Sequence, residues 1–320
     1  MLEVYRAFAE DCVAMPVVAG EKPENERFPG AVATYSIEAM MQDGKALQAG
    51  TSHFLGTTFS SAQNIRFQNS EGELELAQTT SWGVSTRMIG GLIMTHGDDD
   101  GLRVPPRLAP YQIVIVPMLR DTPEDEAILA YCAEIAAELK DCDAFREPVR
   151  VLLDKKAIKA ANKRWSWVKK GAPIIVEVGG RDLAAGNVSV LRRDELYNEA
   201  DKLNSAIMPR GDFVAAAVGM LEAVQQGMFD SANRFLSANI DRDINEISAL
   251  KSYFEGKAKP GWAEVQWARP TGAALDKVVE WLKAEKLTLR NVPRDAPAAD
   301  GTCIFTGAPA VERVLVGRSY

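Results

Sequence analysis

An amide, a hydroxyl and an imidazole stand close together in the segment ALQAGTSHFLG, residues 46–56. These side chains belong to Gln48, Thr51 and His53. In an extended strand Thr51 and His53 would project from the same face, because side chains two residues apart share a face. The residues around them are small and apolar, which is typical of the floor of a pocket. The segment therefore predicts a binding site for a nucleotide or another small polar ligand.

A second polar segment, TTSWGVSTR, occupies residues 79–87. Gly83 carries no side chain, so another group can come close to the backbone there. Ser85 and Arg87 lie two residues apart, and the planar guanidinium of an arginine can bind a phosphate or stack on a base. A surface arginine at the start of a helix is the alternative interpretation, and it is the one favoured by Arg87 taken alone. The apolar run at 88–94 predicts a buried helix.

A run of basic residues at 155–170 contains no acidic residue, and Trp165 and Trp167 lie within it. Lysine and arginine neutralise phosphates, while an indole ring can stack on an unpaired base. The run therefore predicts an RNA-binding helix, with a merely solvated helix face as the alternative. The predicted contacts are Lys163, Arg164, Trp165 and Lys169.

Composition limits the class of protein. The chain of 320 residues is long enough for two or three domains, and its 47% hydrophobic and 25% charged residues are typical of a globular protein. A net charge of -7 argues against holding nucleic acid by bulk attraction, but leaves room for a local basic face. No apolar run approaches the roughly 18 residues that span a bilayer, so no membrane partner is expected. The four scattered cysteines favour reduced thiols in a cytoplasmic protein.

The chain divides into three predicted regions. Pro105-Pro106 marks the first boundary, because proline stiffens the chain and ends regular structure. Half-buried strands and a hairpin are predicted for residues 1–107. In residues 108–205 apolar strands such as 113–116 alternate with helices, which predicts a parallel or mixed sheet with helices on its faces. Residues 206–320 combine amphipathic helices with strands and predict an α+β domain.

Two charged stretches are expected to be solvated. Residues 21–27, EKPENER, are too polar to form part of a core. Asp98, Asp99 and Asp100 are consecutive and point in different directions, which favours a polar turn over a metal site.

Four longer segments carry a resemblance to a known family. They are EAMMQDGKALQAGTSHFLG, TSWGVSTRMIGGLIMTHGDDDGLRVPPRLAP, KGAPIIVEVGGRDL and GTCIFTGAPAVERVLVGRSY. Together they resemble class II prolyl-tRNA synthetases of the archaeal and eukaryotic-like type, and the match runs along the whole chain. Enzymes of this family activate proline with ATP to prolyl-adenylate and transfer the prolyl group to tRNA(Pro).

The resemblance implies a multidomain fold of α/β and α+β type. Residues 1–107 would form the C-terminal part of a class II catalytic domain with an antiparallel sheet. Residues 108–205 would form an anticodon-binding α/β domain with a mixed sheet. Residues 206–320 would form a C-terminal α+β domain, in which some relatives bind zinc through four cysteines. This chain has only Cys303 there, so no zinc is expected.

The resemblance also implies roles for residues of the first region. Arg87 would be the class II motif 3 arginine and the catalytic residue, and it would bind ATP together with Gln48 and Thr51. Catalysis in such a site is largely positioning and electrostatic stabilisation, for which a fixed guanidinium is suited. The proline pocket would be lined by His53, Trp82, Gly83 and Ser85.

Partners and cofactors follow from the same resemblance. The substrates would be L-proline, ATP and tRNA(Pro), with Mg²⁺ bound mainly through the ATP phosphates. Glu177, Arg181 and Asp182 match the segment that recognises the anticodon, with a structural salt bridge as the alternative. Tyr320 matches a C-terminal tyrosine that reaches toward the active site. Full-length family members are cytoplasmic homodimers.

The chain also departs from the family. Nothing in it corresponds to motif 1, which builds the dimer interface, or to motif 2, whose arginine binds an ATP phosphate. Met1-Leu2 matches the point just after motif 2, so we expect a fragment of a longer reading frame that is inactive alone. Pro29 also stands where the family usually has a small residue. A stand-alone tRNA-binding module without catalysis is the alternative, although such a module has no need of a nucleotide site.

Overall fold

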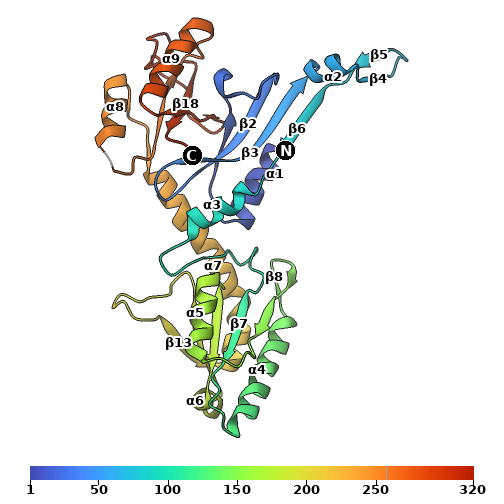
Figure 1. Ribbon diagram of the computed structural model, residues 1–320, viewed down its shortest axis with the longest axis vertical. Helices are drawn as coiled ribbons and strands as arrows, with labels where there is room; N and C mark the ends of the chain where they lie inside the picture. Colours follow the sequence, from blue (N-terminus) through green and yellow to red (C-terminus); the bar gives the residue numbers. More distant parts are fainter. Residues whose placement is uncertain (257) are drawn as a thin grey trace. The chain divides into compact units, whose positions relative to one another are not determined.

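The computed structural model describes residues 1–256 and 258–320, and Figure 1 shows the order of its elements. The chain forms two compact units. The first unit comprises residues 1–11, 15–95 and 233–320, and the second comprises residues 12–14 and 96–232. The division into 1–107, 108–205 and 206–320 remains a prediction.

The first unit contains an antiparallel sheet of five strands in the order β17-β1-β2-β3-β6. The antiparallel sheet predicted for the first region is therefore confirmed. Gly44 allows the tight connection from β2 to β3, because its φ of 82° is left-handed. Strand β17 comes from far along the chain and pairs with β1. The strands are β1 (Val18–Glu21), β2 (Ala33–Met40), β3 (Ala46–Gly56), β6 (Thr79–Gly83) and β17 (Val292–Pro293).

Short helices and a hairpin complete the N-terminal part of this unit. The predicted helix after Arg87 forms, but the prediction that it is buried is wrong, because Ile89 and Ile93 are exposed. Only one face of this helix packs, with Gly91 close to the side chain of Leu47. The elements are α1 (Leu2–Ala7), a π-helix (Phe8–Cys12), a 3₁₀ helix (Glu24–Glu26), α2 (Thr58–Gln63), the hairpin of β4 (Arg66–Gln68) and β5 (Leu74–Leu76), and α3 (Arg87–His96).

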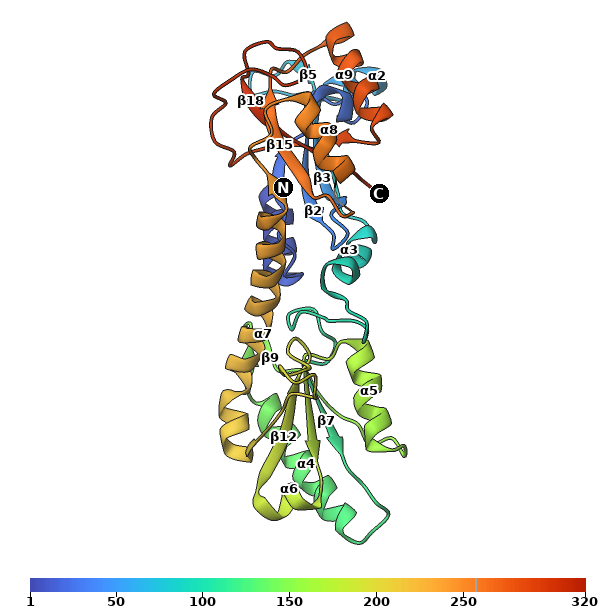
Figure 2. The ribbon, with the colours of Figure 1, turned by 90° about the vertical axis from the view of Figure 1, so that its left-hand side faces the viewer.

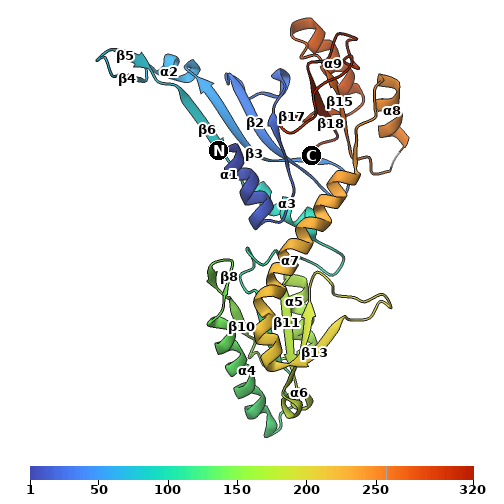
Figure 3. The same cartoon turned by 180° about the vertical axis from the view of Figure 1, so that it is seen from behind.

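A second sheet of the first unit has four strands in the order β14-β15-β18-β16. Its core contains Trp267 and Val314 from the strands and Leu275, Val278 and Leu282 from a helix. Figure 3 shows β15 and β18 beside this helix, and the arrangement confirms the predicted α+β structure. The elements are β14 (Ile240–Asp241), α8 (Ile247–Gly256), β15 (Trp262–Trp267), α9 (Gly272–Ala284), β16 (Thr288–Leu289) and β18 (Glu312–Gly317).

The second unit is built on a mixed sheet in the order β10-β7-β11-β12-β13. Strands β10, β7 and β11 are parallel, and β12 and β13 are antiparallel, so the predicted mixed sheet is confirmed. The strands are β7 (Ile113–Pro117), β10 (Val151–Leu153), β11 (Ile174–Val178), β12 (Asn187–Arg192) and β13 (Ser205–Pro209). The other elements are α4 (Glu124–Lys140), β8 (Asp143–Ala144), β9 (Glu147–Pro148), α5 (Ala160–Lys170), α6 (Gly180–Ala185) and α7 (Arg210–Ala238), the last of which ends in the first unit.

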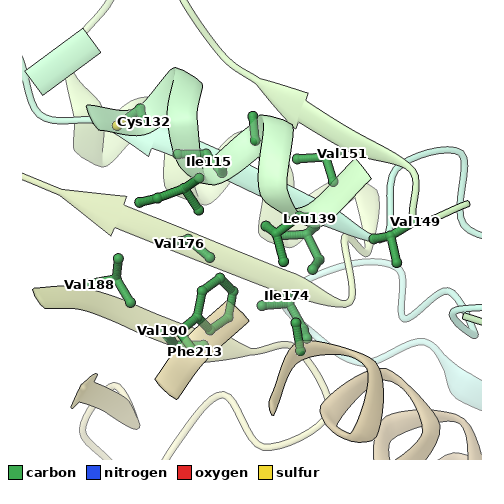
Figure 4. Packing of buried hydrophobic residues seen from close by; sticks show 14 of the residues in the cluster. Ile115, Cys132, Leu139, Val149, Val151, Ile174, Val176, Val188, Val190 and Phe213 are labelled. Carbon is green, nitrogen blue, oxygen red and sulfur yellow. The ribbon is translucent and has the colours of Figure 1, made fainter. Parts of the chain in front are cut away.

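Helices cover both faces of this mixed sheet, as Figure 2 shows for α5 and α7. On one face Ile115 and Val176 pack with Cys132 of α4 and Phe213 of α7, and Figure 4 shows this core. On the other face Val114 packs against α5. Burial on both sides explains why the central strands are continuous apolar runs rather than alternating ones.

The polar turn after α3 is only partly solvated. Asp98 binds both terminal nitrogens of the buried Arg193, and Arg103 Nε lies 2.9 Å from its Oδ2. The prediction of a purely solvated turn is wrong for Asp98, because its charge is compensated within the fold. No helix within residues 1–256 and 258–320 is both long enough and apolar enough to span a bilayer.

We expect the stability of the second unit to fall on acidification because of His96. Its ring is buried, and Nε2 lies 2.9 Å from the carbonyl oxygen of Val13. Burial lowers its pKa to about 4. Between this value and the unfolded pKa of about 6.5, the imidazole binds a proton only in the unfolded chain. The free energy of unfolding therefore decreases by up to about 3 kcal/mol as the pH is lowered through this range.

Urea unfolding at pH 7 and pH 4.5 measures this effect. Replacing His96 by Gln, which can still donate to Val13, should reduce the difference in the free energy of unfolding between the two pH values by about 2 kcal/mol. The same pH dependence in the wild type and the His96→Gln variant would contradict the assignment.

Candidate functional site

A β-bulge in β3 places the predicted ligand residues on one face. The pairing of β2 with β3 joins Ile37 to Gly50 but Glu38 to Gln48, which leaves Ala49 as an extra residue. Without it, Gln48 and Thr51 would point to opposite faces, because they are three residues apart. The juxtaposition that the first motif predicted is therefore present, but the bulge produces it.

The residues of β2 confirm this geometry. Gln48 lies opposite Glu38, Thr51 opposite Ser36, and His53 opposite Thr34. The β2 residues alternate along their strand and so share a face, and residues directly opposite each other also share a face. The amide, the hydroxyl and the imidazole therefore form one polar row.

His53 is held by two groups that the sequence analysis did not identify. Its Nδ1 lies 3.0 Å from Thr34 Oγ1, and that oxygen also accepts the backbone N–H of Phe28 at 3.0 Å. The Phe28 ring lies 4.9 Å from the imidazole, centroid to centroid. Burial lowers the pKa of His53, which favours the neutral ring. A neutral imidazole beside an aromatic ring suits the wall of a pocket more than a proton donor.

The second polar segment lies directly beside this row. Arg87 Nη1 donates to the carbonyl oxygen of Gln48 at 3.2 Å, and the Arg87 backbone N–H donates to Ser85 Oγ at 3.3 Å. Gly83 is paired with Thr51 in the sheet. The structure thus brings together Gln48, Thr51, Gly83, Ser85 and Arg87, and their roles in ligand binding stay predictions.

Trp82 departs from the prediction. It lies opposite Ser52 in the sheet, so its side chain projects from the face opposite to His53. Its side chain cannot line the same wall as His53 in this register. Ser81 lies opposite His53 instead, and the period of two along β6 was the signal that could have identified it.

The basic helix of the second unit is α5, and only part of it faces solvent. Lys163 is 1% exposed, and its Nζ donates to the carbonyl oxygen of Asp154 at 3.0 Å. The prediction that Lys163 contacts RNA does not fit this geometry, because its ammonium is already bonded inside the protein. Trp165 and Lys169 lie on the exposed side.

The predicted anticodon residues are partly engaged within the fold. Arg164 Nη1 lies 3.4 Å from Glu177 Oε2, and Asp182 accepts the backbone N–H of Gly179 at 2.9 Å. The structural ion pair that was the alternative is therefore present for Glu177. Its other oxygen, Oε1, is buried without a hydrogen-bond partner among the described residues. Burial raises the pKa of Glu177, which Arg164 opposes and Asp182 reinforces.

Arg181 follows Glu177 closely in the sequence, and its side chain is exposed. An unsatisfied buried acceptor is costly, which sets Glu177 Oε1 apart from the bonded polar atoms around it. The carboxylate of Glu177 is thus buried and paired with Arg164, while Arg181 offers a cation at the surface. A surface cation of this kind can bind a phosphate.

Metal ligation has no support from side-chain clusters. Over residues 1–256 and 258–320, no group of three or more His, Cys, Asp or Glu side chains is arranged to hold a metal ion. Cys303 is buried in the core around Trp267 and Val314.

The chain is similar to known proteins along its whole length. Residues 112–208 match the family described as the anticodon binding domain. The whole chain is 71% identical to proline–tRNA ligase of Sphingomonas elodea and 67% identical to that of Sphingopyxis alaskensis, and it covers 63% and 60% of these proteins. Its homologues at high identity are proline–tRNA ligases.

A solved structure shows the same similarity. The chain matches prolyl-tRNA synthetase from Cryptosporidium parvum, in complex with halofuginone and AMPPNP, with a TM-score of 0.88 and 31% identity. The match covers 100% of this chain and 62% of that one. The chain therefore spans somewhat less than two thirds of the length of these relatives.

We expect Gly83 to serve a ligand rather than the fold. A Cβ at Gly83 would meet no atom of the described residues within 4 Å, so Gly83→Ala should change the free energy of unfolding by no more than about 0.5 kcal/mol. Gly20→Ala is the matched control, because its Cβ would collide with the backbone carbonyl of Val292 and cost about 1–3 kcal/mol. Equal destabilisation in urea titrations of both variants would show that Gly83 is structural.

Proposed function

We propose that this chain provides the ATP-binding wall, part of the proline pocket and the anticodon-binding domain of a proline–tRNA ligase. The observation that carries the proposal is the single polar row of Gln48, Thr51 and His53, with the guanidinium of Arg87 bonded beside it. The similarity to proline–tRNA ligases along the whole chain supports the same function. The reaction is the activation of proline by ATP, followed by transfer of the prolyl group to tRNA(Pro).

The chemical type of each side chain suggests which part of the substrates it binds. Gln48 and Thr51 offer neutral hydrogen-bonding groups to ATP, and Arg87 offers a positive charge to its phosphates. His53 and Ser85, with the open space at Gly83, bound the proline side of the site. Trp82 has no part in this wall, since its side chain projects from the other face.

Arg87 is the proposed catalytic residue. In the activation step an oxygen of the proline carboxylate bonds to the α-phosphorus of ATP, and pyrophosphate leaves with the electron pair of the broken bond. Negative charge accumulates on the phosphate oxygens, and a fixed guanidinium stabilises it without further reorganisation. The hydrogen bond from Arg87 to the Gln48 carbonyl, at 3.2 Å, fixes the side chain in place.

A further wall is needed for catalysis. Among the described residues β6 pairs on one side only, with β3. We propose that the family's motifs 1 and 2, which have no counterpart in residues 1–320, complete the catalytic sheet and the proline pocket in a longer protein. The chain alone would then bind its ligands weakly and would not catalyse activation.

The remaining features of the proposal follow from the family. Mg²⁺ would arrive with ATP, since the described side chains form no ready cage for it. The C-terminal region would bind no zinc, because its only cysteine is the buried Cys303. The whole enzyme would be a cytoplasmic homodimer of the archaeal and eukaryotic-like type. A stand-alone tRNA-binding module is the alternative, and ATP binding separates the two.

We expect the chain to bind ATP through Arg87. Loss of hydrogen bonds from a charged donor costs about 1.5–3 kcal/mol, so Arg87→Met should weaken ATP binding about tenfold or more in titration calorimetry. Arg66→Met, which removes an exposed arginine of the β4–β5 hairpin, is the matched control and should bind as the wild type does. Proline-dependent pyrophosphate exchange should be absent from all three proteins.

Two outcomes would contradict this proposal. A wild-type chain that binds tRNA but not ATP would favour the tRNA-binding module. Measurable pyrophosphate exchange would show that the chain contains a complete active site.

We expect the exposed cations of the second unit to bind RNA. Lys169→Glu and Arg181→Glu should each weaken binding of a tRNA(Pro) anticodon stem-loop and lower the slope of log K against log salt by about one. Lys140→Glu, at the exposed end of α4, is the control for net charge and should have a smaller effect. Equal effects of all three variants in filter-binding assays would contradict this expectation and would indicate that α5 and α6 present only a solvated surface.

A further inference from the structure

A fully buried carboxylate lies at the centre of a charged cluster in the first unit. Ser36 donates to Glu38 Oε1 at 2.9 Å, and Lys22 Nζ lies 2.8 Å from the same oxygen. Arg290 donates to Oε2 through Nη2 at 2.6 Å and through Nε at 3.2 Å. The predicted solvated loop at 21–27 is therefore wrong for Lys22, which is only 1% exposed.

The charges of this cluster depend on one another. Burial by itself raises the pKa of Glu38, but the charges of Lys22 and Arg290 outweigh burial and hold that pKa below its usual range. Glu38 is therefore a carboxylate at neutral pH. Removing either cation would leave Glu38 with one charged partner in place of two at a site without access to water, which is more disruptive than the loss of a surface ion pair.

Arg290 is itself fixed by its surroundings. Its Nη1 donates to Thr288 Oγ1 at 3.1 Å, and its backbone N–H donates to the carbonyl oxygen of Leu315 at 2.7 Å. The next residue, Asn291, is buried and donates to the carbonyl oxygen of Val18 at 2.9 Å. The segment around Arg290 is thus bonded both to β18 and to β1.

The cluster lies on the same face of the sheet as the candidate ligand residues. Glu38 is directly opposite Gln48, and Ser36 is directly opposite Thr51. The bulge that turns Gln48 toward this face begins between Ile37 and Glu38. The Arg290 guanidinium therefore binds β2 at Glu38, the residue next to the bulge.

We propose that Arg290 is a positioning residue for the ligand wall on β3. By holding Glu38, it fixes β2 at the bulge and keeps Gln48 in one row with Thr51 and His53. Arg290 lies 252 positions after Glu38 in the sequence, so the C-terminal region helps to position the site. The identity of the ligand rests on the proposed function, whereas the positioning of β3 does not.

Hydrogen exchange measures the positioning directly. In Arg290→Met, under conditions where circular dichroism shows a folded chain, the amides of residues 46–53 should exchange about tenfold faster. Arg290→Lys keeps the positive charge but loses the pair of hydrogen bonds from the guanidinium to Glu38 Oε2, so these amides should exchange at an intermediate rate. Arg294→Met removes an exposed arginine of the same segment, which donates to Glu3 at 2.8 Å, and should exchange as the wild type does.

The outcomes of this experiment decide the inference. Unchanged exchange at residues 46–53 in a folded Arg290→Met would overturn it, as would an equal acceleration in β15 and β18, which indicates a general loss of stability. If Arg290→Met does not fold, the comparison of Arg290→Lys with Arg294→Met gives the same decision.

Ligand binding provides a second readout. Titration with ATP should show about tenfold weaker binding to Arg290→Met and a partial recovery in Arg290→Lys, because small displacements of binding groups have large effects. Anticodon stem-loop binding should be unchanged in both. A wild-type chain that binds no ATP would defeat the proposed function, while the exchange rates would still decide on Arg290.

Discussion

One extra residue in a strand is the constraint on which the candidate site depends. Ala49 has no partner of its own in β2, and this bulge brings Gln48 to the face that carries Thr51 and His53. Arg87 lies beside this row, because its guanidinium is bonded to the Gln48 carbonyl. A regular strand of the same sequence would divide these groups between two faces. The bulge therefore converts a polar motif into the wall of a binding site.

The charges around this wall differ in their importance to the fold. Glu38 has no access to water, and its compensation comes from Lys22 and Arg290. Ion pairs on the surface, such as the one between Arg294 and Glu3, contribute little because water already solvates their partners. These buried ion pairs join Glu38 of β2 to Lys22 and to Arg290, so β2 is bonded to both of these segments.

The second unit follows a different physical principle. Its central strands are apolar on both faces, and helices cover each side. Several polar side chains are nevertheless buried in it, among them Lys163, Glu177 and Arg193. Lys163 and Arg193 are bonded to other groups of the fold, whereas Glu177 keeps one carboxylate oxygen without a hydrogen-bond partner among the described residues.

Local periodicity in the sequence by itself determined much of this protein. It predicted the buried strand at 113–116, a parallel or mixed sheet around it, and the shared face of Thr51 and His53, because these follow from neighbouring residues. The antiparallel sheet of the first region was implied by the family resemblance instead. The four family segments predicted the similarity to proline–tRNA ligases, since they are long and specific.

Only the tertiary structure decided that Gln48 joins the polar row, that Lys163 turns inward and that Trp82 turns away. The bulge and the strand register depend on which residues pair across the sheet, and the orientation of Lys163 depends on its acceptor at Asp154. These partners are brought together by the fold, so no pattern of neighbouring residues encodes them.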